Sequence, residues 1–237
     1  MAETLALFSF GPTGWGDELA IGAWLTIRLA IATLPFGLAL GFLIALAKRS
    51  HNRALRGLGN LFTTVFRGLP ELLTIFLVYF GLQLLVQKAA SLVSDAPVAL
   101  PGFISGFIAL GLVFAAYSSE VFLTAFNNLK RGQIEAATAL ALPRFPTVFI
   151  VLLPQFVRIA LPGIANLWLV LLKDTSLISV IAVDDLMRAT YIAVGATKQP
   201  FPFYLVACLT YLGMSIVSSF GIYAIERWSE RGVRRAA

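Results

Sequence analysis

The sequence predicts an all-α, polytopic membrane protein with about five transmembrane helices. Of its 237 residues, 59% are hydrophobic and only 13% are charged, and the mean hydropathy is +0.86. A water-soluble protein cannot bury that much apolar sequence, because polar residues must cover its surface. The apolar residues also form long stretches, and the basic residues gather in the short segments between them. We therefore expect a single transmembrane domain over residues 1–237.

Five apolar stretches are near or above the length that crosses a hydrocarbon layer about 30 Å thick, which takes about 20 helical residues. They cover residues 19–47, 61–86, 103–126, 147–172 and 202–225. Pro35 lies inside the first stretch and is expected to kink that helix. Gly68 and Pro70 lie inside the second, in the string RGLPEL, where they weaken the helix hydrogen bonds. The third stretch ends in AAYSSEVF, which places Glu120 inside an apolar run.

The segment that follows the fourth stretch, LLKDTSLISVIAVDDL, is harder to assign. Its apolar part, residues 177–183, is too short to cross a membrane. We expect this part to be re-entrant or to lie at the outer membrane interface. A sixth membrane helix is the structural alternative.

The basic residues predict the orientation, because Lys and Arg stay on the cytoplasmic side of an inner membrane. The first loop, the third loop and the tail carry Lys48, Arg49, Arg53, Arg56, Lys130, Arg131, Arg144, Arg227, Arg231, Arg234 and Arg235. The other side has Glu3, Asp17 and Glu18 without a base, and Lys88 against Asp95. Five crossings therefore place the N-terminus outside and the C-terminus in the cytoplasm. The net charge of +6 thus reflects orientation and does not indicate nucleic-acid binding.

One polar segment differs from everything around it. Residues Gly132–Leu142 form one predicted helix of small and polar side chains, which Pro143 and Pro146 terminate. This helix is too short and too polar to cross the membrane. It lies between two basic segments, so we expect it on the cytoplasmic side.

The string Glu135-Ala136-Ala137, followed by Leu153-Pro154, resembles the "EAA" signature of the permease subunits of ATP-binding-cassette (ABC) importers. In that family a short coupling helix docks into a groove of the ATP-binding subunit. The resemblance implies that Glu135 makes a charge-assisted contact with that subunit and that the small side chains permit close approach. It assigns the coupling role to Gly132, Glu135, Ala136, Ala137, Ala141 and Pro154. The family's usual glycine, six residues after the glutamate, is replaced here by Ala141.

Further strings support a narrower resemblance. RGLPEL, YSSEVF, RGQIEAA, LPGIANLW and LLKDTSL occur in the order found in polar amino-acid permeases, over roughly residues 20–230. They are most similar to the histidine/lysine-arginine-ornithine and opine branch. The resemblance implies a type I ABC importer fold, which imports amino acids across a bacterial inner membrane. Basic amino acids (arginine, lysine, histidine, ornithine) are the expected substrates, and opines such as octopine or nopaline, or other polar amino acids, are the alternative.

The resemblance also implies partners. They are an ATPase dimer, a second permease subunit that is either a paralogue or another copy of this chain, a periplasmic substrate-binding protein and membrane lipid. ATP and Mg would be used by the partner ATPase, and we expect this chain to bind no cofactor, no metal and no nucleic acid.

Ionisable side chains within membrane spans indicate where a substrate binds, because such groups usually face a cavity or a partner. Glu71 follows the weakened helix and lies roughly 15 Å along its span, near the midplane, where it could hold a cationic substrate group. Lys173 could meet the substrate carboxylate, with Asp174, Thr175 and Ser176 nearby. Two structural alternatives compete, namely an ion pair of Glu71 with Arg67 or Arg28, and an internal Lys173–Asp174 pair. We include Glu120 with the candidates, although a structural or gating role suits it better.

Two other classes of function fit the sequence poorly. A membrane-embedded enzyme needs a nucleophile with a base or an acidic metal cluster. The sole histidine, His51, lies in a loop, and the pair Asp184-Asp185 lacks the further acids of a metal site. A secondary transporter would need a longer chain, an internal repeat or a symmetric oligomer, and it would leave the coupling helix unexplained.

Overall fold

The computed structural model describes residues 6–92, 99–181 and 183–230. Five of the charges used above to predict orientation lie outside these residues: Glu3, Asp95, Arg231, Arg234 and Arg235. All the regular secondary structure among the described residues is helical, and turns or short loops connect the helices. Five helical segments are long and apolar enough to cross a membrane, which confirms the predicted all-α membrane fold.

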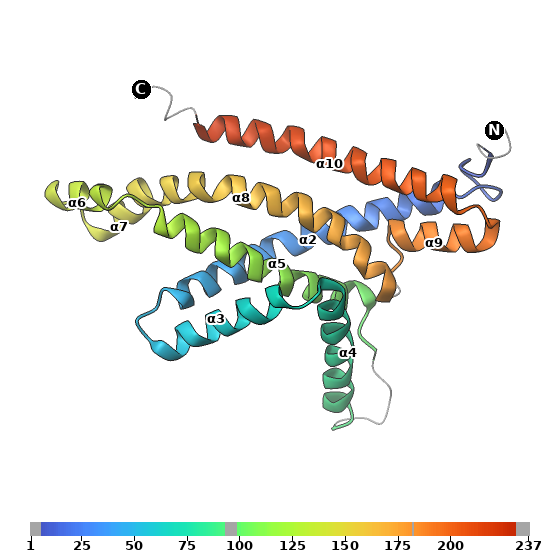
Figure 1. The fold of residues 1–237 in the computed structure, drawn as a ribbon, viewed down its shortest axis with the longest axis horizontal. Helices are drawn as coiled ribbons and strands as arrows, with labels where there is room; N and C mark the ends of the chain where they lie inside the picture. Colours follow the sequence, from blue (N-terminus) through green and yellow to red (C-terminus); the bar gives the residue numbers. More distant parts are fainter. Residues whose placement is uncertain (1–5, 93–98, 182, 231–237) are drawn as a thin grey trace.

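The helices follow one another in the order shown in Figure 1. They are α2 (Gly16–Lys48), α3 (Arg53–Gly68), α4 (Glu71–Ala90), α5 (Gly102–Asn127), α6 (Arg131–Ala139), α7 (Arg144–Pro146), the π-helical turn η1 (Thr147–Leu152), α8 (Leu153–Asp174), the 3-10 helix η2 (Thr175–Ile181), α9 (Leu186–Thr197) and α10 (Pro200–Glu230). The candidate membrane spans are α2, α4, α5, the continuous run Arg144–Ile181, and Pro200–Arg227 within α10.

The second predicted span is not one helix. The structure divides it into α3 and α4, with a break at Leu69 and Pro70. Proline disfavours the helical conformation of the residue before it, and Leu69 is extended, with φ −92° and ψ 147°. Figure 1 shows that α4 then turns away from the direction of the long helices. The predicted span over residues 61–86 is therefore wrong in its bounds, because the candidate membrane helix is α4 and begins at Glu71. Glu71 thus lies at one end of the candidate span and not near its middle, and Gly68, Leu69 and Pro70 at the break are exposed.

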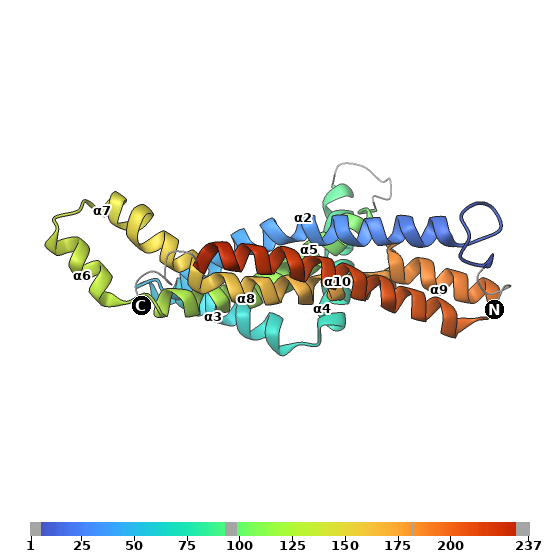
Figure 2. The ribbon, with the colours of Figure 1, turned by 90° about the horizontal axis from the view of Figure 1, so that it is seen from above.

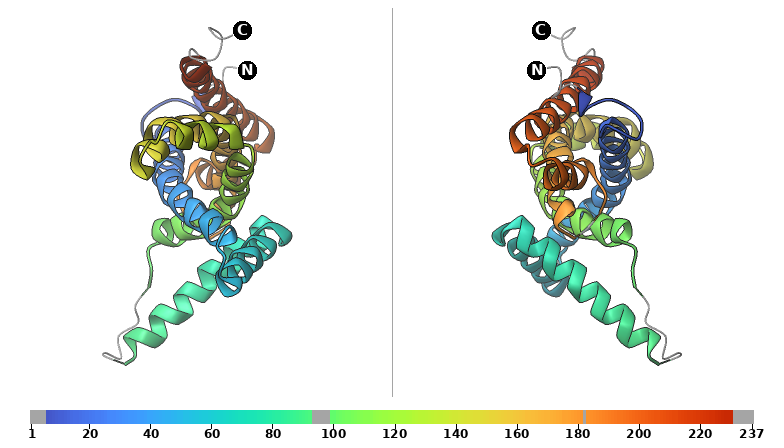
Figure 3. Two further views of the ribbon diagram at one scale, coloured as in Figure 1. Left: turned by 90° about the vertical axis from the view of Figure 1, so that its left-hand side faces the viewer. Right: turned by 90° about the vertical axis from the view of Figure 1, so that its right-hand side faces the viewer.

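The close packing of α2 on α5 forms the centre of the bundle. Gly37 and Gly41 lie one turn apart on α2 and face α5, and Ser118 Oγ donates a hydrogen bond of 3.2 Å to the Gly37 carbonyl. A Cβ atom at Gly41 would lie only 2.8 Å from the carbonyl oxygen of Ala115. Small residues at such spacing let membrane helices approach closely without a hydrophobic driving force. The helix α5 also contacts α3, α4 and α8. Figure 3 shows that α3 and α4 project to one side of the other helices.

The apolar segment after the fourth stretch belongs to the core. Residues 175–181 continue α8 as the 3-10 helix η2, in which Ile178 and Ile181 are buried against Leu29, Ile75 and Phe114. Ile178 fits against the bare backbone of Gly106, where a Cβ atom would lie 2.8 Å from its Cγ2. The segment is therefore neither a sixth membrane helix nor an interfacial one, because an apolar core already surrounds it.

The bundle has two distinct ends. Figures 1 and 2 show α6 and α7 together at one end, which we call the α6 end, and α9 at the other. The last described turns of α10 and the start of α3 point toward the α6 end. The N-terminal part of α2 lies at the opposite end, beside α9.

Candidate functional site

The break between α3 and α4 places the ends of two helices beside ionisable side chains. Glu71 is the first residue of α4 and is half-buried. A helix begins with backbone N–H groups that have no partner within the helix, and its end leaves unpaired carbonyls. The break therefore presents the free N–H groups of α4 beside the free carbonyls of α3. Half-helix ends of this kind hold charged substrates in membrane transporters.

Two side chains from other helices lie close to Glu71. Tyr117 comes from the middle of α5 and Asp174 from the last turn of α8, and both interact electrostatically with the Glu71 carboxylate. The structure thus brings together the predicted candidates Glu71 and Asp174 and a third polar side chain, Tyr117, from segments far apart in the sequence. Tyr117 was missed, although the string YSSEVF places it three residues before Glu120, which is about one turn along the same helix face.

Glu120 belongs to an ion network beside this cluster. Its Oε1 atom lies 2.5 Å from Lys48 Nζ and 3.3 Å from Arg67 NH1. Lys48 Nζ also donates a hydrogen bond of 3.2 Å to Thr63 Oγ1. Within the described part of the chain, Arg67 pairs with Glu120 and not with Glu71, so the predicted alternative of an Arg67–Glu71 ion pair is wrong.

The remaining predicted substrate residues lie at the end of α8. Lys173 is exposed, and no ion pair among the described residues joins it to Asp174. Thr175 is buried and donates its hydroxyl to the Leu172 carbonyl at 2.7 Å, and Ser176 donates to the Lys173 carbonyl at the same distance. Both hydroxyls therefore satisfy the backbone where α8 passes into η2. Arg28 is exposed on α2.

The short polar helix α6 is shorter than expected and ends in a defined motif. It spans Arg131–Ala139, not Gly132–Leu142. The N–H of Leu142 bonds to the Ala137 carbonyl at 3.0 Å, and the N–H of Ala141 bonds to the Thr138 carbonyl at 2.9 Å. These two bonds form a Schellman motif, whose left-handed position favours glycine. Ala141 occupies that position with φ 51°, so alanine at this site terminates the helix in a strained conformation.

Replacing Ala141 with glycine is expected to stabilise the end of α6. The left-handed conformation costs an L-residue about 1–2 kcal/mol, and glycine avoids this cost. Part of the gain is offset, because glycine loses more backbone entropy on folding than alanine does. We expect amide hydrogen exchange in residues 131–142 to slow by a few-fold, on the order of fivefold for 1 kcal/mol. Ala139→Gly is the matched control, because glycine inside a helix is less favourable than alanine and should speed exchange. Faster exchange in Ala141→Gly would contradict the strain argument.

The two faces of α6 are different. Ala137 is 3% exposed, and the helix contacts η1, whereas Gly132, Glu135 and Ala136 are exposed. Successive helical residues are about 100° apart, so Glu135 lies on the face opposite Ala137. The carboxylate of the predicted coupling segment therefore lies on the exposed side of α6, opposite the buried Ala137.

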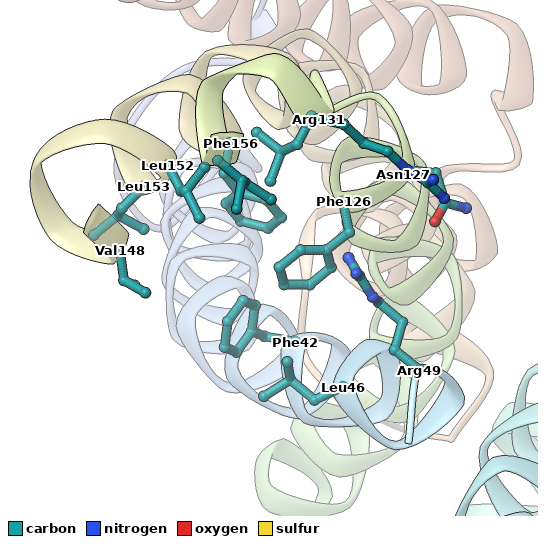
Figure 4. A pocket seen from close by; sticks show the side chains of 12 residues that line it. Phe42, Leu46, Arg49, Phe126, Asn127, Arg131, Val148, Leu152, Leu153 and Phe156 are labelled. Carbon is teal, nitrogen blue, oxygen red and sulfur yellow. The ribbon is translucent and has the colours of Figure 1, made fainter. Parts of the chain in front are cut away.

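A cavity of about 590 Å³ separates α6 from the bundle (Figure 4). Its floor contains Phe42, Phe126 and Phe156, and the Arg49 guanidinium lies 4.6 Å from the centre of the Phe126 ring. The remaining lining comes from the last turns of α2 and α5, from α6, from η1 and from the start of α8. Pro154 is exposed at the start of α8, directly after the π-helical turn. A π-helical turn interrupts regular α-helix hydrogen bonding, so α6 is joined to α8 through an irregular connection.

Asp185 has a structural role outside the membrane spans. Its side chain caps α9 by accepting a hydrogen bond of 2.9 Å from the Arg188 N–H. Burial raises the pKa of the Asp185 carboxyl to about 7, although hydrogen bonds from backbone N–H groups oppose the shift. Among the described residues, no group of three or more His, Cys, Asp or Glu side chains is arranged to hold a metal ion.

A bundle of apolar helices long enough to cross a membrane, with acidic side chains beside a helix break and a short polar helix at one end, is typical of the membrane-spanning part of a transport system. The chain belongs to the family of binding-protein-dependent transport system inner membrane components, which matches residues 37–235. It is therefore a multi-pass inner-membrane transport component and not an enzyme.

Individual relatives agree with this assignment. The chain is 43% identical over 232 residues to the nopaline transport system permease protein of Agrobacterium fabrum, covering 97% of this chain and 98% of that protein. It is 34% identical over 223 residues to the histidine/lysine/arginine/ornithine transport system permease protein of Escherichia coli, covering 94% and 98%. The predicted membership of the polar amino-acid branch is thereby confirmed.

A solved structure has the same fold. It is a crystal structure of an amino acid ABC transporter with histidines, which aligns with a TM-score of 0.78 and 27% identity over 90% of this chain and 94% of that one. The ABC importer permease fold expected from the motifs is confirmed.

Proposed function

We propose that this chain is the permease subunit of an ABC importer that takes up basic amino acids: arginine, lysine, histidine and ornithine. The observation that carries the proposal is the pair of carboxylates, Glu71 and Asp174, beside the break in the membrane helix. Two neighbouring acids repel each other, and a cation between them relieves that repulsion. The name of the Escherichia coli relative, a histidine/lysine/arginine/ornithine permease, supports the same substrate class.

In this proposal each predicted residue has a role. Glu71 and Asp174 hold the cationic side chain of the substrate, and the exposed Lys173 meets its α-carboxylate. Thr175 and Ser176 support the end of α8 that carries this pair. Glu120 stays paired within the ion network.

The proposed partners follow from the helix α6. Its exposed face, which carries Glu135, would dock into an ATPase dimer that uses ATP and Mg, while this chain binds no cofactor. A second permease subunit and a periplasmic binding protein complete the proposed assembly. The α6 end would then face the cytoplasm and the N-terminus the outside, and loss of ATP-driven uptake on changing Glu135 would support this orientation.

Opines are the second candidate substrates. The 43% identity to the nopaline permease favours them. Octopine and nopaline are N-carboxyalkyl derivatives of arginine, so they present the same guanidinium group to Glu71 and Asp174.

Competition in reconstituted vesicles tests the proposal. The permease is purified with its ATPase, second permease and binding protein, and ATP-dependent uptake of labelled arginine is measured in proteoliposomes. We expect unlabelled lysine, ornithine, histidine or octopine to compete, and glutamine and glutamate to compete much more weakly. Glutamine or glutamate competing as well as lysine would overturn the assignment to cationic substrates.

A further inference from the structure

A polar cavity lies beside the acidic cluster of Glu71 and Asp174, shares Tyr117 with it and carries the opposite charge. It has a volume of about 470 Å³ and is lined by Lys48, Asn60, Thr63, Thr64, Arg67, Gly68, Tyr117 and Glu120. Its charged lining consists of two cations and one carboxylate, so the cavity has an excess of one positive charge. A cavity within a membrane protein that has such an excess is suited to an anionic group.

The two cations are bound to Glu120 unequally. The Lys48 side chain is only 8% exposed and lies 2.5 Å from the Glu120 carboxylate, and it is also held by Thr63. The Arg67 side chain is 44% exposed and lies farther from the same oxygen, at 3.3 Å. Lys48 therefore neutralises Glu120 by itself, so that Arg67 can bind another carboxylate without leaving Glu120 unpaired.

Tyr117 connects this cavity to the acidic cluster. The Arg67 guanidinium lies 5.5 Å from the centre of the Tyr117 ring, and the Tyr117 side chain interacts electrostatically with Glu71 and Asp174. Tyr117 also lines a small pocket together with Asp174. The acidic cluster of Glu71 and Asp174 and the positively charged cavity with Arg67 thus meet at the Tyr117 ring. Together they form a site with a negative end and a positive end.

We propose that Arg67 binds a carboxylate which the substrate carries in addition to its α-carboxylate, and that Arg67 thereby determines selectivity for N-carboxyalkyl derivatives of basic amino acids. This inference rests on the proposed function, because it places the cationic end of the same substrate at Glu71 and Asp174. Arginine has a single carboxylate, which Lys173 would bind. Octopine has one further carboxylate and nopaline has two, so only these substrates have a carboxylate left for Arg67. Arg67 is suited to this task because its planar fork of N–H groups binds carboxylates in a bidentate manner.

The inference is tested by measuring ligand binding to the purified permease–ATPase complex in detergent. The periplasmic binding protein is left out, so that its own selectivity does not affect the result. Labelled arginine and labelled octopine are titrated against the wild type, Arg67→Gln, Arg67→Lys and Arg53→Gln. We expect Arg67→Gln to weaken octopine binding by about tenfold or more, as for the loss of one charge-assisted contact, and arginine binding by less than about threefold. Arg67→Lys should restore part of the octopine affinity.

The control Arg53→Gln removes an equal charge from the exposed start of the same helix and should change neither affinity. Equal weakening of arginine and octopine by Arg67→Gln would show that Arg67 only supports the helix break, which overturns the inference. Wild-type binding of arginine but not of octopine would overturn it as well, while leaving the proposed function intact. If the wild type bound neither ligand, the proposed function would fail and the inference with it.

Discussion

Replacing Glu71 with glutamine is expected to lower the uptake of arginine and lysine by about tenfold to a hundredfold. Glutamine keeps the size of the side chain and one acceptor oxygen but removes the charge that would attract a cationic substrate. Hydrogen bonds to charged groups contribute about 1.5–3 kcal/mol, and each 1.4 kcal/mol is a tenfold change in affinity. The measurement is the concentration dependence of ATP-driven uptake in proteoliposomes, with labelled arginine, lysine and glutamine.

The control for this prediction is Glu18→Gln, which removes an acid from the exposed start of α2, away from the break. It should leave uptake of all three amino acids unchanged. Asp174→Asn should act in the same direction as Glu71→Gln, since both acids lie beside the same break. If Glu71→Gln lowered glutamine uptake as much as arginine uptake, Glu71 would have a structural role and no part in recognising the substrate cation.

Replacing Glu135 with lysine is expected to abolish ATP-driven uptake, with a loss of about a hundredfold or more. Glu135 lies on the face of α6 opposite the buried Ala137, where a partner subunit could reach it. Breaking a buried charge pair across an interface costs about 2–5 kcal/mol, and a reversed charge adds repulsion. The readouts are uptake and copurification of the ATPase with the permease in detergent.

Gln133→Lys is the matched control for the coupling helix. It introduces the same side chain into the same helix, about 160° around the axis from Glu135. We expect it to retain both uptake and copurification. Normal uptake by the Glu135→Lys variant would refute the proposed docking through α6, whereas loss of uptake in both variants would point to a general effect of positive charge on this helix.

Much of the fold was predictable because it depends on consecutive residues. Run length identified the number of spans, although the second one begins at Glu71 and not at residue 61, and the string around Pro70 identified the place where the helix is interrupted. The string left a simple kink and a helix break both open, and the structure shows a break that separates α3 from α4. The strain at Ala141 was also missed, because residues 140–142 continue the helical composition and only the backbone geometry reveals the left-handed turn.

The candidate site was predicted in part. The sequence singled out Glu71, Asp174 and Glu120 because each is an ionisable residue within or next to an apolar stretch. The sequence did not reveal that Glu120 pairs with Lys48 and Arg67. Lys48 and Glu120 are 72 positions apart, so their pairing cannot be predicted from neighbouring residues. Arg67 could pair with either Glu71 or Glu120, and both are carboxylates. No local pattern distinguishes such partners.

The sequence by itself determined that this protein is a helical membrane protein of the importer-permease type, because hydrophobic length, basic loops and a short motif are local properties. Only the tertiary structure decided that the break at Pro70 lies beside Tyr117 and Asp174, and that a cavity of opposite charge adjoins them. Those neighbours come from different helices, and the glycine-mediated approach of α2 to α5 helps to set how these helices pack. Electrostatic interaction falls with distance, so the charge pattern of the site exists only once the bundle has packed.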